Sequence, residues 1–233
     1  MTHSKLRQKL TLAGKILAKG GQSDFTRGHI SIRLPNDPAL FLMKAHSVGF
    51  DEITPRSILT VNLRGEVVAG KGRRHSEVFI HSEILKARQD VNCVIHTHPP
   101  YAIAFSAVDR QVKAYSQAGA LFHNALGIYS DSISLVRDPE MGAGVARALG
   151  PHRAALLKNH GAVVAAPSVE EAVISAIMLE TAAMIQMIVE ATGKPATEFP
   201  IEDIETLKRQ LSKPDQFQIN FDYLTRQVKR SGK

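Results

Sequence analysis

The sequence has very little cysteine and no tryptophan. Among its 233 residues there is one cysteine, Cys93. A single cysteine excludes an intrachain disulfide bond, and a chain without disulfides is typical of a reducing compartment. The composition therefore predicts a cytoplasmic protein that is stabilised by its apolar core rather than by covalent cross-links.

Long uninterrupted hydrophobic runs are also absent from the sequence. The first residues, Met1–Arg7, include no apolar segment of the kind found in signal peptides. The longest apolar stretch, 172–189, is interrupted by Glu180 and preceded by Glu170 and Glu171. We therefore expect this stretch to form a buried helix, and we expect no membrane association.

Acidic residues are fewer than basic ones, and the formal net charge is +7. The densest basic segments are 71–75 and 226–233, and neither contains an aromatic residue. There is also no helix-turn-helix or zinc-finger spacing. A basic chain of this kind favours small anionic substrates over nucleic acid as its partners.

Hydrophobic periodicity indicates a mixture of helices and strands in one domain. The region between 107 and 139, which contains scattered glycines, is expected to be mostly loop. Because several strands form close hairpin-like pairs, we predict a single three-layer α/β/α domain with a central mixed, largely antiparallel sheet and helices on both faces. Helices are expected over 4–19, 76–88, 100–107, 139–149, 169–192 and 201–211, and strands over 28–34, 39–43, 58–63, 65–69, 91–96, 153–157 and 162–166.

Two histidines follow an apolar, β-branched segment within Val94–Pro100. Since side chains alternate along a strand, His96 and His98 should point the same way at the strand end. Two such imidazoles form half of a transition-metal site. A third candidate, His160, lies at a turn between two apolar runs. Three neutral imidazoles with an open fourth position are typical of a catalytic metal site.

With these motifs the sequence resembles the class II aldolase/adducin superfamily over residues 8–193. Members of that family include sugar-phosphate aldolases and epimerases, a dehydratase, and decarboxylases of hydroxylated aromatic or pyridine dicarboxylates, while adducins keep the fold without enzymatic activity. The resemblance implies one domain over 1–233, with a core of about 8–193 and a C-terminal extension over 194–233. It rests on five motifs in chain order: Gly28–Arg33, Ser76–Glu77, His96–Pro99, Leu157–Gly161 and Ser168–Ala172.

The resemblance also implies roles for individual residues. Glu77 falls at the family's acid/base carboxylate. Tyr115 lies near the position of a tyrosine that donates a proton within a neighbouring subunit's site. The family pattern also implies a C4-type homotetramer with sites at subunit interfaces. His81 shares the helix face of Glu77, so a fourth metal ligand or a partner of a ligand are alternatives for it, but we expect it to have a structural role. The family's ligands for a divalent metal, Zn²⁺ or Mn²⁺, correspond to His96, His98 and His160.

The sequence departs from the sugar-phosphate aldolases where those enzymes bind phosphate. A Gly-Asn pair, a Thr-Pro-Ser/Thr-Gly segment and a Ser-Ser pair are replaced here by Gly28–His29, Lys44–Ser47 and His75–Ser76. Imidazoles and a lysine thus stand in place of small amides and hydroxyls. Such groups favour carboxylates, through charge-assisted hydrogen bonds. The predicted substrate-binding residues are His29, Lys44, His46, Ser47, Arg73 (or its neighbour Arg74), His75 and Ser76.

These observations favour a metal-dependent carbon–carbon lyase that acts on a small, unphosphorylated substrate bearing carboxylates. Decarboxylation of a hydroxylated aromatic or heteroaromatic acid is the preferred version, with Glu77 or Tyr115 protonating the ring carbon. One alternative is a sugar-phosphate aldolase or epimerase with altered phosphate ligands. A second is an adducin-like scaffold without chemistry, although a scaffold would have no need of the three histidines and the glutamate.

Overall fold

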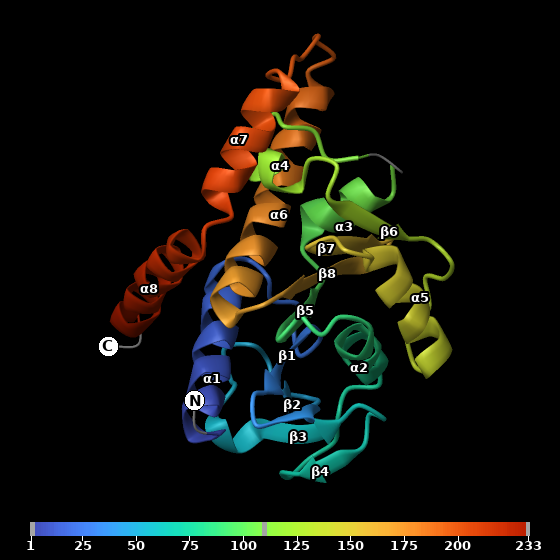
Figure 1. The fold of residues 1–233 in the computed structure, drawn as a ribbon, viewed down its shortest axis with the longest axis vertical. Helices are drawn as coiled ribbons and strands as arrows, with labels where there is room; N and C mark the ends of the chain where they lie inside the picture. The colour runs from blue at the N-terminus through green and yellow to red at the C-terminus, as the bar shows by residue number, and fades with distance from the viewer. Residues whose placement is uncertain (1–2, 109–110, 232–233) are drawn as a thin grey trace.

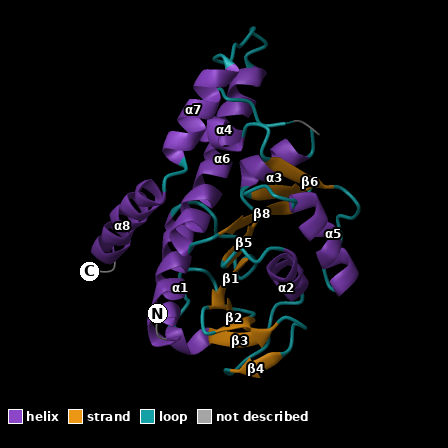
Figure 2. Cartoon of the chain, viewed as in Figure 1, coloured by secondary structure: helices purple, strands orange, loops and turns teal. Residues whose placement is uncertain are grey.

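The computed structural model describes residues 3–108 and 111–231. The strands of this part of the chain form one eight-stranded sheet, with helices on both sides of it (Figure 1, Figure 2). The strands are β1 (His29–Leu34), β2 (Asp37–Lys44), β3 (Ile58–Asn62), β4 (Val67–Ala69), β5 (Cys93–Thr97), β6 (Leu126–Tyr129), β7 (Ala154–Leu157) and β8 (Gly161–Ala166). The helices are α1 (His3–Lys19), a 3₁₀ turn η1 (Pro55–Ser57), α2 (Val78–Ala87), α3 (Pro100–Ser106), α4 (Gln117–Phe122), α5 (Pro139–Leu149), α6 (Val169–Ala191), α7 (Ile201–Leu211) and α8 (Pro214–Ser231).

The sheet is mixed and largely antiparallel, which confirms the predicted fold class. Its strand order is β4-β3-β2-β1-β5-β8-β7-β6, and every neighbouring pair is antiparallel except β6 and β7. Helices α1, α3 and α6 pack on one face of the sheet, and α2 and α5 pack on the other (Figure 1). Strands β1, β5 and β8 therefore lie in the middle of the sheet, covered on both sides.

Strand β1 explains how polar groups come to be buried in the centre of the fold. All six of its residues are buried, so the side chains on both faces need partners. Ile30 and Ile32 join the apolar core under α1 and α6. The alternate side chains, His29, Ser31 and Arg33, face α2, where the Arg33 guanidinium donates to the carbonyl oxygens at the C-terminal end of that helix.

Helix α6 is a core helix of this fold. By length and composition it would be able to cross a membrane, and half of its most apolar window is buried inside the protein. It packs against α1, α3, α4 and α8 and against strands β5 and β8. This packing agrees with the expectation of a buried helix.

Besides the 3₁₀ turn η1, the sequence interpretation missed three elements. The region between 107 and 139 holds α4 and β6, so the expectation of a loop there is wrong in part. These elements span only six and four residues, which is too short for periodicity to separate them from loop. Helix α8 was also missed because its sequence is mostly polar. Only Phe217 and Phe221, four residues apart, form a buried stripe.

Helices α7 and α8 fall in the predicted C-terminal extension. Helix α7 packs on α4, while α8 packs on α6 and α1. The extension therefore lies against the predicted core, and its division from that core at residue 193 stays a prediction. The predicted domain covers the whole chain, and its positions 1–2, 109–110 and 232–233 lie outside the described residues.

Candidate metal centre

The three motif histidines meet where two neighbouring strands of the sheet come together. Strand β5 carries His96 and is followed by His98, and β8 begins directly after His160. Because β5 and β8 pair antiparallel with Thr97 opposite Ala162, the turn before β8 lies beside the end of β5. The Nε2 atoms of His96 and His98 are 3.1 Å apart, and the ring centroids of His98 and His160 are 5.3 Å apart.

Glycine at position 161 is required for this approach. A Cβ atom on Gly161 would lie 2.5 Å from the carbonyl oxygen of Thr97 and 2.9 Å from the ring of His98. The preceding residue, Asn159, has a φ of 58°, a conformation that asparagine tolerates better than most residues. The Lys158–Gly161 turn can therefore bring His160 against the end of β5 only because of the residue types at these two positions.

Glu77 stands at the N-terminal end of α2 and completes the cluster. Its Oε1 accepts a hydrogen bond of 3.0 Å from the Val136 amide and lies 3.6 Å from Nε2 of His160. Its Oε2 lies 3.9 Å from Nε2 of His96. One potential ligand atom from each of these four residues, Glu77, His96, His98 and His160, lies within 4.8 Å of all the others.

The histidine nitrogens are arranged as metal ligands usually are. Nδ1 of His96 lies 3.1 Å from the carbonyl oxygen of Ala162, which can only accept, so His96 carries its proton on Nδ1 and its Nε2 lone pair faces the cluster. Nδ1 of His98 lies 3.2 Å from the Asp24 carboxylate without a well-aligned hydrogen bond, and the negative charge beside it favours a proton on Nδ1. Two Nε2 lone pairs then face each other across 3.1 Å, and a cation between them would relieve their repulsion.

Distances and burial fit a divalent metal as well. Two nitrogens at about 2.0–2.1 Å from a tetrahedral zinc are roughly 3.3 Å apart, close to the 3.1 Å between His96 and His98. Both ring nitrogens of His160 are buried and find no hydrogen-bond partner within residues 3–108 and 111–231. Burial lowers the pKa of His96 well below its usual value and lowers the pKa of His98 to about 4. The neutral imidazole, the form that binds metals, is therefore favoured.

The carboxyl group of Glu77 is shifted in the opposite direction. Burial raises its pKa, against the lowering effects of the Val136 amide and of the positive charge of Arg137. A raised pKa allows a carboxyl group to hold a proton near neutral pH, as a general acid must. A bound cation would oppose this shift.

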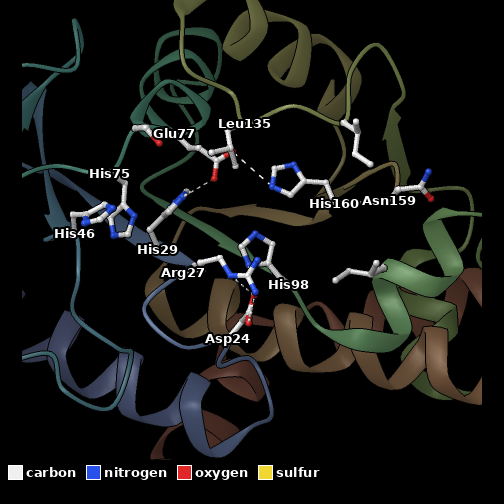
Figure 3. Close-up of a pocket in the computed structure, with 14 residues that line it drawn as sticks. Asp24, Arg27, His29, His46, His75, Glu77, His98, Leu135, Asn159 and His160 are labelled. Atoms are coloured by element: carbon white, nitrogen blue, oxygen red, sulfur yellow. Dashed lines mark hydrogen bonds and ion pairs between the residues drawn. The ribbon is translucent and has the colours of Figure 1, made fainter.

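A cavity of about 400 Å³ opens above the cluster (Figure 3). One part of its wall is apolar and includes Ile103, Ile133 and Leu135. Polar side chains from β1, the 44–48 turn and the start of α2 contribute much of the rest. Figure 3 shows Glu77 between His29 and His160, with His75 and His46 further along the same side. The cavity can therefore hold a small molecule that is apolar on one side and polar on the other.

Four of the seven predicted substrate-binding residues line this cavity: His29, His46, His75 and Ser76. Arg73 lines an adjoining open cavity of about 630 Å³, which shares His46 and Ser76 with the first. Ser47 is exposed, and its hydroxyl lies 2.6 Å from Nδ1 of His46. The structure thus gathers most of this set along one wall.

Lys44 has a different environment from the one we expected. Its side chain is fully buried, and its ammonium donates to the carbonyl oxygens of Thr26 and Val48. Burial lowers its pKa to about 8. These contacts join the segment before Gly28 to the 44–48 turn. We therefore assign Lys44 to supporting the cavity wall instead of binding substrate.

Tyr115 is not among the residues that line this cavity; it lines a separate cavity of about 370 Å³ together with Phe199 and Ile204. Its hydroxyl accepts a hydrogen bond of 3.2 Å from the Lys113 ammonium. Action of Tyr115 in a neighbouring subunit's site stays a prediction.

Sequence reasoning missed several residues around the centre. Asp24 and Arg27 line the cavity, and the Arg27 guanidinium is paired with the Asp24 carboxylate. Their three-residue spacing in a loop gives no periodic signal. Ser31 was also missed, although its alternation with His29 on one strand could have placed the two on the same face. His81, expected to be structural, contacts His29 directly, with Nε2 at 2.6 Å from Nδ1.

Comparison with known proteins connects this centre to a family. Residues 8–187 match the family model of the class II aldolase and adducin N-terminal domain. A 3,4-dihydroxyphthalate decarboxylase from Arthrobacter keyseri is 30% identical, covering 89% of this chain and 88% of the relative. The decarboxylase NovR from Streptomyces niveus is 33% identical, over 82% of this chain and 72% of its own length. A solved aldolase II superfamily protein from Pseudomonas syringae superposes with a TM-score of 0.89 at 28% identity, covering 99% and 94% of the two chains.

Proposed function

We propose that this chain, which belongs to the class II aldolase and adducin family, is a metal-dependent lyase that decarboxylates a small hydroxylated aromatic or heteroaromatic acid. The family includes both decarboxylases and aldolases. The observation that carries the proposal is the convergence of His96, His98 and His160 with Glu77 at the base of the cavity.

The residues divide the chemistry between them. The three imidazoles would hold a divalent cation, Zn²⁺ or Mn²⁺, which supplies an electron sink for the negative charge that develops on the substrate as the carbon–carbon bond breaks. Glu77, whose pKa is raised by burial, lies beside the cluster and would deliver a proton to the carbon that loses the carboxylate. His29, His46 and His75 receive the anionic groups of the substrate along the polar wall.

The apolar part of the wall favours a ring over a sugar chain. Ile133 and Leu135, on the loop after β6, are 65% and 40% exposed in this structure. Both border the cavity, so a flat ring seated against them would bury apolar surface. They would also keep water from the carbon that receives the proton. A phosphorylated sugar would offer these side chains little to bury.

The proposal is tested by offering the purified, metal-loaded protein a panel of substrates. Zn²⁺-loaded and Mn²⁺-loaded protein would be incubated with 3,4-dihydroxyphthalate, and release of CO₂ would be followed together with the ultraviolet spectrum. In parallel, 5-deoxy-D-ribulose 1-phosphate and L-fuculose 1-phosphate would be followed by coupled detection of the aldehyde and ketone products. Turnover of the aromatic acid alone supports the proposal, and turnover of a ketose phosphate alone refutes it.

A sugar-phosphate aldolase is the second candidate. Its support is a 25% identical relative, the 5-deoxy-D-ribulose 1-phosphate aldolase of Bacillus thuringiensis, which matches 90% of this chain and 96% of its own length. The imidazole-rich wall weighs against it, because the buried His75 and His29 favour their neutral forms, which suit a dianionic phosphate less well than a carboxylate. An adducin-like role without chemistry would leave the protein inert towards every member of the panel and without stoichiometric metal.

A further inference from the structure

A chain of three buried side chains runs from the middle of β1, through α2, to the cavity. The Ser31 hydroxyl lies 2.7 Å from Nδ1 of His81, and Nε2 of His81 lies 2.6 Å from Nδ1 of His29. None of the three side chains belongs to the metal cluster, and each residue is at most 1% exposed. Both hydrogen bonds are short enough that each must contain one proton.

The far end of this chain is open. Nε2 of His29 is buried and has no hydrogen-bond partner among the residues that the structure describes. His29 also lines the cavity above the metal cluster. Oε2 of Glu77 lies 3.7 Å from this nitrogen, beyond hydrogen-bond distance. An unpaired buried polar atom of this kind is costly unless a ligand satisfies it.

Only two neutral arrangements of the protons are possible. In the first, Ser31 donates to His81, His81 donates to His29, and His29 keeps its remaining proton on Nε2. In the second, His29 donates from Nδ1 to His81, and His81 donates from its own Nδ1 to Ser31. Nε2 of His29 then has a lone pair and no proton. A charged arrangement is disfavoured because it would place a positive charge on side chains that are at most 1% exposed, and burial lowers the pKa of His81 to about 3.

The serine distinguishes between the two arrangements. In the reversed arrangement the hydroxyl proton of Ser31 would need another acceptor, and none is present for that side chain among the hydrogen bonds of the described residues. A buried hydroxyl without an acceptor is unfavourable. In the first arrangement every group of the chain is satisfied except Nε2–H of His29, which faces the cavity.

We propose that Ser31 and His81 are positioning residues that hold Nε2 of His29 as a hydrogen-bond donor for an anionic oxygen of the substrate. The inference rests on the proposed function in one respect, namely that the cavity takes an acid. The tautomer itself does not depend on what the enzyme converts. A carboxylate oxygen that accepts from Nε2–H would satisfy the one atom that the buried chain leaves unpaired.

The tautomers of His29 and His81 are measurable by nitrogen-15 NMR of histidine-labelled, zinc-loaded full-length protein. Protonated and bare ring nitrogens have very different shifts, and the signals would be assigned with single-histidine variants. We expect both residues to be neutral with the proton on Nε2. In Ser31→Ala, which removes the donor at the start of the chain, we expect a mixture of the two tautomers at His29.

The matched control is Ser82→Ala. Ser82 follows His81 on α2 and is also fully buried, but its hydroxyl has no hydrogen-bond partner within the described part of the chain. Its replacement should leave both tautomers as in the wild type. A wild-type His29 with its proton on Nδ1, or with both nitrogens protonated, would overturn the inference. So would a Ser31→Ala spectrum that is identical to that of Ser82→Ala.

A second measurement tests the anionic ligand. Phthalate, a diacid without the hydroxyl groups, would be titrated into the zinc-loaded protein while the Nε2–H signal of His29 is followed. We expect this signal to shift with binding, and we expect Ser31→Ala to weaken phthalate binding about 3- to 10-fold, as loss of one oriented hydrogen bond would. Binding of phthalate that leaves the signal unmoved, or no binding of phthalate at all, would refute the anion role. If the tautomers are as expected but the enzyme decarboxylates nothing, the proposed function fails and the assignment of Ser31 and His81 stands.

Discussion

The backbone amide of Val136 donates a hydrogen bond of 3.0 Å to Oε1 of Glu77. This contact joins the loop after β6 to the start of α2, two segments that are 59 residues apart. It fixes one carboxylate oxygen, while the other, Oε2, lies closest to the ring nitrogens of His29 and His96. Oε1 also lies 3.6 Å from Nε2 of His160, so Glu77 combines a structural task, the bond to Val136, with a chemical task at the metal cluster, which both of its oxygens approach.

Replacement of Glu77 by glutamine tests the chemical task. The amide oxygen of glutamine can still accept from Val136, so the fold and the three histidines should be undisturbed. We expect kcat to fall by about 10²–10⁴, the usual contribution of a general acid, with metal content unchanged. The control is Glu83→Gln on the same helix, whose carboxylate pairs with Lys86. Loss of the metal together with activity would show instead that Glu77 is mainly a ligand.

The metal centre is tested by removing one imidazole at a time. His98→Asn should lower the bound zinc or manganese from about one ion per chain to well below that, because two imidazoles form an incomplete site. Metal content after gentle purification would be measured by plasma mass spectrometry. His123→Asn, which alters a histidine near Glu198 outside the cluster, should keep the wild-type content. Equal metal content in the two variants would argue against the assigned centre.

How far the sequence predicts this centre depends on whether the geometry is local. The convergence of His96 and His98 follows from strand alternation, and the position of His160 at a turn follows from its two flanking apolar runs. That the turn lies beside the end of β5 depends on pairing between β5 and β8, strands about 65 residues apart, which no local pattern reveals. The sheet class was predictable because hairpins are formed by segments that are close in the sequence. The short α4 and β6 and the polar α8 were not predictable.

The polar wall of the cavity, where substrate is expected to bind, was likewise only partly predictable from the sequence. His29 and His75 were expected there from the motifs, and both line the cavity. Lys44 was expected there too, but its ammonium donates to carbonyl oxygens from two segments, Thr26 before β1 and Val48 after β2. Asp24 was not predicted at the site, and only the structure shows its carboxylate 3.2 Å from Nδ1 of His98. Motif positions therefore identify the wall, and tertiary contacts decide which side chains face the cavity.

The Asp24 carboxylate should matter for metal affinity even though it is not assigned as a ligand. It lies beside Nδ1 of His98 and so favours the tautomer with a free Nε2. We expect Asp24→Asn to weaken zinc binding about 10- to 100-fold, as measured by competition with a chromophoric chelator. The exposed Asp37→Asn, at the start of β2, serves as the control and should bind zinc like the wild type. An unchanged affinity in Asp24→Asn would mean that another group orients His98.

Stability should decline in mild acid because of buried neutral histidines. Burial lowers the pKa of His81 and of His75 to about 3, from a usual value of 6.5. Between these values the unfolded chain binds protons that the folded chain does not, so the free energy of unfolding decreases as the pH falls below about 6.5. Each such group contributes up to about 1.4 kcal/mol per pH unit.

Urea denaturation of the metal-free protein between about pH 7 and about pH 5 measures this slope. In His81→Gln one titrating group is removed, so the stability should depend less steeply on pH by up to the amount given for one histidine. Ser82→Ala, on the same helix and equally buried, should keep the wild-type slope. If the free energy of unfolding depended on pH equally steeply in His81→Gln and in the wild type, this would contradict a buried, neutral His81.

The proposed action of Tyr115 in a neighbouring subunit predicts a specific complementation. Suppose that each site combines Glu77 of one chain with Tyr115 of the next chain in a ring. Both Glu77→Gln and Tyr115→Phe homo-oligomers should then be nearly inactive. After the two variants are unfolded together in equal amounts and refolded, about a quarter of the sites would receive both native residues by random assembly. We therefore expect about a quarter of the wild-type activity to return, together with an oligomer in size-exclusion chromatography coupled to light scattering. Mixing without refolding is the control. A mixture that stays inactive would place both residues' functions within one chain. An active Tyr115→Phe homo-oligomer would leave Tyr115, whose hydroxyl accepts a hydrogen bond from Lys113 in this structure, outside the reaction.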